Sequence, residues 1–542
     1  MTAMPTMLTF PTIDLCLVLT TCLFSFIAGA EQQPFHGNDE PEAFHVAIVG
    51  AGLAGASSAY YLSNLSTSYF SHPLKITVYE ASSNVGGQVK RIFPPLDEHA
   101  LEAGATHFFK DDWCLTEAAQ STNLTRRRAS PVWGDIWAWN EKRSSQDRFC
   151  YKEAPRKIPP FWDPRPHARK EVRDAFNRFL DTVTFEWENS WVPWRTRRKI
   201  SSLQAKFNSL GQNGTFQSIQ EELEKLGLGE SISSSAEQFL DNMGVPRSLQ
   251  ANLIEPCVRD SFGMSLKDAL GLHVIASVGS TRSSPIAIDG GNVNLIGRMI
   301  EQSGAELRLD SRVTKVGPGI HRRFALEIGT SKLAKPQYVE YDAIILTGDS
   351  ATHLRPTSMQ QPTSIQSHVT HFATMYWLKQ NEHSSHLGWI PLAAFTTANS
   401  SFSDTNDSAH ITRLTTHGEF YIDRRDCSED DLCDQAFHVH RIDSNQRLTQ
   451  ESLHAMMTEP RHDQIFWIDR QSWNRTFPPA KASGDTGFSN IELEPNLFNV
   501  KSDMLDTMEM SCRMGRNVAL KLYDQRLLTG FLGQETNGIW LS

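Results

Sequence analysis

The chain has 542 residues, with 52 Lys plus Arg against 62 Asp plus Glu, which gives a formal net charge of −10. This acidic balance is not that of a nucleic-acid-binding protein, which gathers Lys and Arg on one face. Hydrophobic residues make up 39% of the chain and include 29 Phe, so a packed core is expected. At roughly 100 to 200 residues per domain, the length indicates two or three domains and excludes a small binding module.

An apolar run near the N-terminus, residues 13–30, predicts a secretory signal peptide over residues 1–30. The run ends in Ala28-Gly29-Ala30, a pattern typical of a cleavage site, and the polar residue Glu31 follows. No Lys or Arg precedes the run and Asp14 lies at its edge, so an uncleaved signal anchor remains the alternative. A cleaved signal peptide places the protein in the secretory pathway.

Cysteines and glycosylation acceptors agree with that compartment. A bridge from Cys427 to Cys433 across an acidic loop is the first disulfide expected, while two surface thiols or pairings elsewhere are equally compatible. Without the signal peptide, six cysteines remain: Cys114, Cys150, Cys257, Cys427, Cys433 and Cys512. The Asn-x-Ser/Thr acceptors are consistent with secretion, and begin at Asn64, Asn123, Asn213, Asn399, Asn406 and Asn474.

The first segment after the polar linker has the pattern of a dinucleotide site. A buried strand, His45–Val49, runs directly into Gly50-Ala51-Gly52-Leu53-Ala54-Gly55, and a helix rich in small residues follows. In such a GxGxxG loop, Gly50 allows the tight turn, Gly52 lets backbone amides approach a pyrophosphate, and Gly55 lets helix and strand pack closely. The helix N-terminus then contributes partial positive charge toward the phosphates.

A second strand, Lys75–Tyr79, ends in Glu80, which is expected to accept hydrogen bonds from ribose hydroxyls. About 25 residues separate Gly55 from Glu80, where roughly 20 are typical, and this ordered series predicts dinucleotide binding. The longer spacing and the residues beyond Glu80 favour FAD over NAD.

Those residues resemble the amine-oxidase-like group of flavoproteins, in which Glu-Ala precedes Gly-Gly-Arg. Here Gly87 is followed by Gln88 in place of the arginine that approaches the phosphates, and Lys90 or Arg91 is the expected source of the missing charge. The resemblance extends to residues 101–105, where it implies that Gly104 and Ala105 bring backbone close to the flavin.

Four later elements complete this resemblance. A helix opening at residues 289–296 and a strand over residues 305–316 imply a backbone contact between Val313 and adenine. A further buried strand is predicted at residues 341–348. The segment 505–519 is predicted to be a helix whose N-terminus, at Glu509 and Met510, points at the flavin.

The predicted fold class is α/β, with a glutathione-reductase-like Rossmann domain for FAD interleaved with a helical and mixed-sheet substrate domain. Residues 44–128, 279–355 and 489–525 are assigned to the FAD-binding domain. Residues 129–278 and 356–488 are assigned to the substrate domain, where helical spacing of Val and Phe and scattered Trp indicate a helical insertion.

Residues 256–265, residues 288–292 and the segment from Met508 to Ala519 together resemble the prenylcysteine oxidase (prenylcysteine lyase) family. The resemblance implies a secreted or lysosomal FAD thioether oxidase that cleaves farnesyl- or geranylgeranyl-cysteine. Hydride leaves C1 of the prenyl group, water adds to give a hemithioacetal, and its collapse releases cysteine and a prenyl aldehyde, while molecular oxygen becomes hydrogen peroxide. The sequence departs from the family pattern at Asp260, Ser261 and Phe262.

Within this chemistry His107 is the candidate for positioning water, against a structural histidine, and Arg259 is the candidate partner for the substrate carboxylate, against a structural ion pair. No metal site or stable protein partner is predicted. The expected partners are a lipophilic small-molecule substrate and oxygen. Two alternatives remain: a related FAD oxidase acting on another lipophilic small molecule such as a biosynthetic intermediate or amine, and a catalytically silent binding protein.

Overall fold

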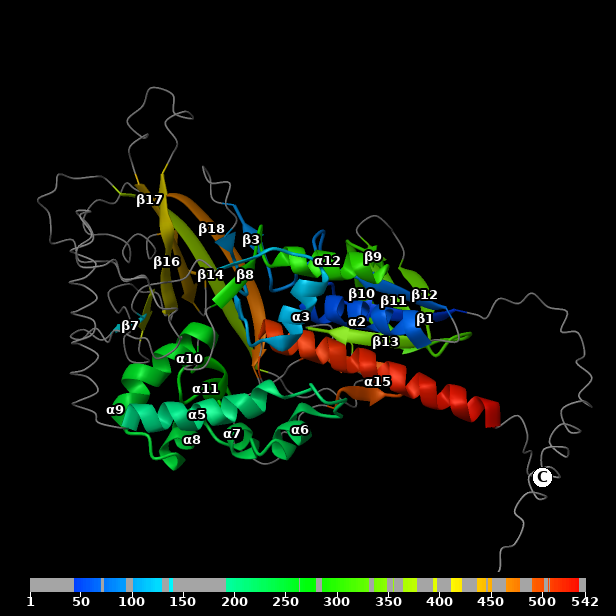
Figure 1. Cartoon of the computed structure of the whole chain (residues 1–542). Helices are drawn as coiled ribbons and strands as arrows, with labels where there is room; N and C mark the ends of the chain where they lie inside the picture. The colour runs from blue at the N-terminus through cyan, green and yellow to red at the C-terminus, as the bar shows by residue number, and fades with distance from the viewer. Residues whose placement is uncertain are drawn as a thin grey trace, which may run out of the picture. The chain divides into compact units, whose positions relative to one another are not determined.

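The computed structural model describes residues 43–69, 73–93, 101–128, 136–139, 192–262, 264–278, 285–330, 336–348, 354, 364–377, 393–396, 411–421, 436–444, 447–450, 465–477, 490–501, 505 and 507–535. The predicted signal peptide and the first-choice bridge from Cys427 to Cys433 lie outside these residues. The described residues, from residue 43 onward, belong to one compact unit (Figure 1). Across the described ranges, no helix combines the length and the apolar character that crossing a membrane requires.

A mainly parallel sheet forms around the predicted glycine loop. β1 (Phe44–Val49) pairs in parallel with β2 (Leu74–Tyr79) on one side and β13 (Ala343–Thr347) on the other. The strand order is β19-β20-β13-β1-β2-β9, so segments far apart in sequence lie side by side. The remaining strands are β9 (Glu306–Arg308), β19 (Glu492–Glu494) and β20 (Leu497–Val500). This is the predicted Rossmann-type arrangement.

Both faces of this sheet are buried, which explains why β1 is apolar throughout. Successive side chains of a strand point to opposite faces, so Val46 and Ile48 join one core cluster and Ala47 and Val49 another. Helices cover the first face, and a three-stranded antiparallel sheet covers the second. The helices are α2 (Leu53–Tyr69), α12 (Val293–Ser303) and α15 (Met508–Glu535), and the strands are β10 (Ser311–Pro318), β11 (Phe324–Thr330) and β12 (Gln337–Tyr341).

The single strand predicted over residues 305–316 is two strands in two different sheets, so that prediction was wrong. β9 ends at Arg308, and β10 begins at Ser311. Between them Asp310 adopts a positive φ of 50°, a left-handed conformation that Asp tolerates better than most residues. The turn sends the chain from the parallel sheet into the antiparallel one.

A second six-stranded sheet has the order β18-β14-β17-β16-β15-β7. Its central strands pair in antiparallel fashion, and β7 pairs in parallel with β15. Its strands are β7 (Ile136–Trp139), β14 (Ser364–Trp377), β15 (Ala393–Thr396), β16 (Ile411–Tyr421), β17 (Ala436–Ser444) and β18 (Ile465–Phe477). We call it the substrate sheet, because its strands come from the segments predicted to build the substrate domain.

The predicted helical insertion is confirmed in the described residues from Val192 onward. α10 contacts the substrate sheet at β7, β15 and β16. Gly244 has a positive φ of 74° and separates α8 from α9. The helices are α5 (Val192–Asn208), α6 (Ile219–Lys225), α7 (Gly229–Ser233), α8 (Ala236–Asn242), α9 (Arg247–Leu249), the π-helix η1 (Gln250–Ile254), α10 (Glu255–Phe262) and α11 (Gly271–Ser277).

Several short elements belong to neither of the two large sheets. They are β3 (Arg91–Ile92) paired with β4 (Leu101–Glu102), the three strands β5 (Phe108–Phe109), β8 (Pro285–Ile288) and β6 (Arg126–Arg128), and helix α3 (Trp113–Ser121). The strands of the parallel sheet lie within 44–79, 306–347 and 492–500, and those of the substrate sheet within 136–139 and 364–477. The exact domain boundaries stay a prediction.

Candidate functional site

At two positions of the GxGxxG loop, neighbouring protein atoms leave no room for a side chain, so glycine is needed there. Gly50 has a positive φ of 110°, and a Cβ at this position would lie 2.2 Å from Thr347 Oγ1 on β13. A Cβ at Gly55 would lie 2.0 Å from the Gly50 carbonyl oxygen. Both distances are far below any tolerated contact, so the turn and the close approach of α2 to β1 account for these glycines.

Gly52 is different, because nothing in the protein excludes a side chain there. A Cβ at Gly52 would lie 3.9 Å from the Gly86 carbonyl oxygen and 4.0 Å from Gly87 Cα, which is ordinary van der Waals contact. Its backbone conformation also needs no glycine. What glycine adds at this position is open space in front of the N-terminus of α2, where unpaired amides and the helix dipole attract phosphate. The loop therefore fits the pyrophosphate of a dinucleotide.

The Gly86–Gln88 segment lies alongside this loop. The Gly86 amide donates to the Ala51 carbonyl at 3.0 Å, and Gly87 has a positive φ of 58°. The Gln88 side chain is exposed. These positions agree with a segment that runs past the cofactor, and the contacts of Gly87 and Gln88 with it stay predictions.

The two cations expected to replace the missing arginine both bind protein groups. Lys90 Nζ donates to Gln471 Oε1 at 2.7 Å, and Arg91 Nη1 donates to the Gly290 carbonyl at 2.8 Å. Neither contact directs a charge toward the glycine loop.

Glu80 stands at the carboxyl end of β2 and faces the glycine loop. Its Oε2 accepts from the Ala51 amide at 2.9 Å, while its Oε1 accepts from the Ser82 amide at 2.9 Å and the Ser82 hydroxyl at 2.8 Å. A carboxylate offers about four acceptor positions, so Oε2 retains one for a ribose hydroxyl. The Ser311 amide donates to the Glu80 carbonyl at 2.8 Å, which brings the start of β10 beside Glu80. The Val313 side chain on β10 is buried in the core, and its backbone contact with adenine stays a prediction.

The loop expected to contact the flavin follows β4. The Ala105 amide donates to the Gln88 carbonyl at 3.2 Å, so Gly104 and Ala105 lie beside the Gly87–Gln88 segment. His107, the predicted water-positioning residue, is half-buried, and its Nδ1 forms a 2.8 Å hydrogen bond with Thr106 Oγ1. Its ring meets the Phe109 ring edge-on at 5.3 Å.

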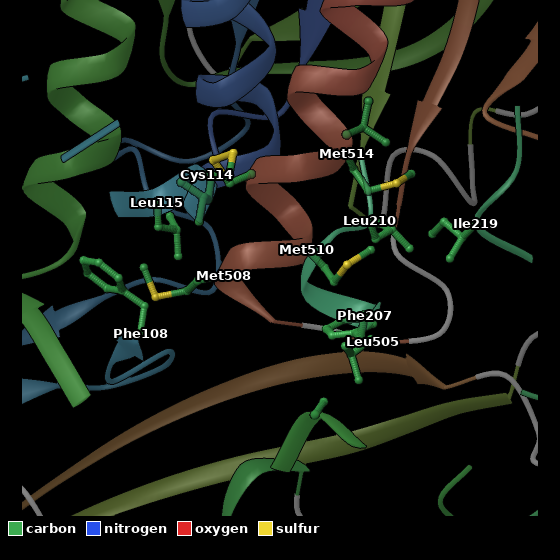
Figure 2. Close-up of a cluster of buried hydrophobic side chains, with 14 of the residues drawn as sticks. Phe108, Cys114, Leu115, Phe207, Leu210, Ile219, Leu505, Met508, Met510 and Met514 are labelled. Carbon is green, nitrogen blue, oxygen red and sulfur yellow. A yellow bond between two sulfur atoms is a disulfide. The ribbon is translucent and has the colours of Figure 1, made fainter. Parts of the chain in front are cut away.

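Glu509 and Met510, predicted to contact the cofactor, direct their side chains into the protein. The Glu509 carboxylate accepts from the amides of Cys114 and Leu115 at 3.1 Å each, and Arg513 Nε donates to it at 2.6 Å. Burial raises the pKa of the Glu509 carboxyl, and the Arg513 guanidinium opposes that rise. Met510 lies in a buried apolar cluster around the first turns of α15 (Figure 2). Only the backbone of the helix N-terminus remains for the predicted role.

A disulfide that the sequence analysis did not pair fixes this region. Cys114 at the start of α3 is bonded to Cys512 in α15, across 398 residues of sequence. Both residues are fully buried, and Figure 2 shows the bond at the edge of the apolar cluster. Cys257 is also disulfide-bonded.

Arg259 already has a carboxylate partner. Its Nη2 and Nε donate to Glu255 Oε1 at 2.7 and 3.0 Å, one turn earlier in α10, and its side chain is buried. This is the structural ion pair that stood as the alternative. Its role toward the substrate carboxylate stays a prediction.

The loop that begins at the end of β4 comprises residues 102–107, and three residues in or beside it were missed. Glu102 Oε1 accepts from the Asn292 amide at 2.6 Å, and burial raises the pKa of Glu102 to about 7. Asn292, fully buried before α12, follows a glycine pair, which is a pattern typical of a helix start. Arg441 on β17 forms a buried ion pair with Asp443 at 3.2 Å. Nothing in the local sequence pattern connects residue 441 with residue 102.

The sequence profile of the prenylcysteine lyase family matches residues 174–529, and a profile of NAD(P)-binding Rossmann-like domains matches residues 48–118. The chain belongs to the prenylcysteine lyase family. This membership confirms the resemblance inferred from the motifs near residues 256–265 and in α15.

One curated relative is a farnesylcysteine lyase of Arabidopsis thaliana, 23% identical over 314 residues. That alignment spans 55% of this chain and 56% of the relative. Among solved structures, putrescine oxidase bound to putrescine is 14% identical with a TM-score of 0.51, covering 89% of this chain and all of that one. Cyclohexylamine oxidase from Brevibacterium oxydans is 12% identical with a TM-score of 0.50, covering 89% of this chain and 99% of that one. At these identities the solved structures show the fold alone. The chain has the scaffold of a flavin-dependent oxidoreductase.

Proposed function

We propose that this protein is an FAD-dependent thioether oxidase that cleaves farnesyl- or geranylgeranyl-cysteine. The family match over residues 174–529 carries the proposal, since it includes most of the predicted substrate domain. The reaction takes the thioether, water and oxygen, and gives cysteine, a prenyl aldehyde and hydrogen peroxide. FAD, when bound, supplies the acceptor for the two electrons of the C–H bond.

The chain's own residues have distinct parts in this proposal. The open space at Gly52 and the α2 N-terminus hold the pyrophosphate, and Glu80 holds the ribose. Gly104 and Ala105 present backbone to the flavin ring. His107, with its Nδ1 engaged by Thr106, positions the water that adds to the oxidised carbon.

The decisive experiment is anaerobic mixing of the purified holoprotein with farnesylcysteine. We expect the absorbance band of oxidised flavin to bleach, farnesal and cysteine to appear in equal amounts, and peroxide to form when oxygen is admitted. A flavin that bleaches with dithionite but not with any prenylcysteine would overturn the substrate assignment. A preparation without flavin after reconstitution with FAD would overturn the enzyme assignment.

A related oxidase of another lipophilic small molecule is the second candidate, because residues 260–262 depart from the family pattern. Phe262 is buried and meets the His273 ring edge-on at 4.8 Å, so the change at residue 262 concerns core packing, while Ser261 is exposed. In the same assay, bleaching by an amine such as putrescine and not by farnesylcysteine would favour this candidate.

We further propose that the protein matures in the secretory pathway. The buried disulfide from Cys114 to Cys512 supports this location, since structural disulfides form and persist in oxidising compartments. N-terminal sequencing of the protein secreted from eukaryotic cells is expected to begin at or near Glu31. Recovery of an intact Met1 on soluble protein would contradict a cleaved signal.

A further inference from the structure

A side chain of the substrate sheet donates hydrogen bonds to carbonyl oxygens of the 102–107 loop. Arg441 Nη1 on β17 donates to the Gly104 carbonyl at 3.3 Å and approaches the Glu102 carbonyl at 3.5 Å. Its Nε is bound to both carboxylate oxygens of Asp443 at 3.2 Å, and both side chains are 4% exposed. A planar guanidinium fixed at Nε by a carboxylate has a defined direction for its other N–H groups. Asp443 therefore aims Arg441 at the loop.

Asn292 holds the other half of the loop. Its Nδ2 donates to the carbonyls of Ala105 and Thr106 at 3.2 and 3.1 Å, while its Oδ1 accepts from the Ile288 amide at 3.0 Å. A fully buried side-chain amide with all these contacts is rigid, because any rotation leaves buried polar groups unpaired.

Some backbone amides of the 102–107 loop donate to other protein groups, and others do not. The Ala103 amide donates to the Lys90 carbonyl at 2.7 Å, and the Ala105 amide to the Gln88 carbonyl. Within the described part of the chain, the amides of Gly104 and Thr106 have no hydrogen-bond partner, and both residues are half-buried. With the carbonyls of residues 102, 104, 105 and 106 each accepting a hydrogen bond, the Gly104 and Thr106 amides are the donors that the loop still offers. Flavin N5, O4, N1 and O2 are acceptors, so the loop matches the ring chemically.

We propose that Arg441, aimed by Asp443, is a positioning residue for the flavin: it ties the 102–107 loop to the substrate sheet so that the Gly104 and Thr106 amides face the flavin ring. The inference rests on the FAD site of the proposed function. It does not depend on the identity of the substrate. It also means that the sheet contributed by the predicted substrate domain takes part in holding the cofactor.

Arg441→Lys tests this inference on the FAD-reconstituted full chain. Lysine keeps a cation beside Asp443, but its single nitrogen cannot hold both the carboxylate and the loop. We expect the dissociation constant for FAD to rise about tenfold, the equivalent of one or two lost hydrogen bonds. We also expect the visible circular dichroism and the reduction potential of the bound flavin to change. The unfolding midpoint of the apoprotein should change little.

Asp443→Asn provides a second variant with the same expected direction and a smaller effect, because a neutral amide aims the guanidinium less strongly. The matched control is Arg322→Lys, the same replacement in a partly buried ion pair with Asp342, which lies at the amino ends of β1 and β13. Normal FAD affinity and normal flavin dichroism in both Arg441→Lys and Asp443→Asn would overturn the proposal. Changes of equal size in the Arg322→Lys control would also overturn it. Unaltered protein that holds FAD but resists reduction by farnesylcysteine would count against the proposed substrate and leave this inference standing.

Discussion

A methyl group at residue 52 is expected to remove FAD without removing the fold. The ideal Cβ of Gly52→Ala meets no protein atom closer than 3.9 Å, so the apoprotein should unfold at nearly the same temperature. The same methyl group occupies the space through which the pyrophosphate reaches the loop amides. Flavin stoichiometry from absorbance and thermal unfolding of the apoprotein measure the two effects separately.

Gly55→Ala is the matched control for that variant. Its Cβ would lie 2.0 Å from the Gly50 carbonyl oxygen, so α2 must move away from β1. Overpacking of this kind costs about 1–3 kcal/mol or more. Here a lowered unfolding midpoint in the apoprotein is expected. If Gly52→Ala instead bound a full equivalent of FAD at wild-type affinity, the dinucleotide assignment would be wrong.

Glu102 should make the stability depend on pH. Burial raises its pKa from 4.5 to about 7, in spite of the Asn292 amide and the charges of Arg127, Arg91 and Arg441. Because the unfolded chain loses the proton at lower pH than the folded protein, the free energy of unfolding falls as pH rises from about 4.5 to about 7. Above about pH 7 the ionisation of Glu102 no longer changes the free energy of unfolding.

Glu102→Gln removes this titration and keeps an oxygen that accepts from the Asn292 amide. Urea unfolding of the apoprotein at pH 5 and pH 8 should show the variant gaining stability relative to the unaltered chain at the higher pH. Two stability profiles that run parallel across this range would mean that Glu102 is not protonated in the folded protein near neutral pH.

At the scale of elements, α3 and α15 act as one unit. The Cys114–Cys512 bond and the Glu509 carboxylate join the start of α3 to the first turns of α15. Replacing both cysteines by serine should lower the free energy of unfolding by about 2–4 kcal/mol, through a less constrained unfolded chain. It should also weaken FAD binding, because the start of α15 loses its covalent attachment.

Chemical unfolding monitored by Trp fluorescence, with and without FAD, measures both effects. Dithiothreitol alone, without denaturant, is expected to leave the unaltered protein intact, since both cysteines are fully buried. A double variant as stable as the unaltered chain would show that packing around α15, rather than the disulfide, holds the two helices together.

Local elements could be predicted from the sequence, and long-range pairings could not. The strand, glycine loop, helix and second strand up to Glu80 lie within 40 residues, and each step has its own pattern of apolar and small residues. The pairing of Cys512 with Cys114 depends on how α15 packs against α3. The position of Arg441 against the 102–107 loop depends on how the substrate sheet meets the rest of the protein. The split at Asp310 was missed because strand propensity continues through it, while one left-handed residue ends the strand.

At the scale of the whole molecule, the proposed substrate divides into an apolar chain and a charged cysteine end. Burial stabilises binding by roughly 0.8 kcal/mol per CH₂-sized group, so a 15-carbon chain should be strongly preferred over a short one. We expect farnesylcysteine to reduce the bound flavin far faster than S-propylcysteine at equal concentration. Stopped-flow absorbance under argon measures both rates. Equal rates would mean that no apolar site receives the chain, and would favour the second candidate function.

The separation of Cys114 and Cys512 in the sequence also determines how long Cys114 waits for its partner during synthesis. The two residues are 398 positions apart, so at roughly 5–20 residues per second the ribosome needs roughly 20–80 s to extend the chain from one to the other. Through that interval Cys114 has no Cys512 to pair with, and Cys150, Cys257, Cys427 and Cys433 are synthesised before Cys512 is. β20, which completes the parallel sheet beside β13, is also made late. In the compartment proposed here, any earlier pairing of Cys114 must be undone by thiol–disulfide exchange before the Cys114–Cys512 bond can form.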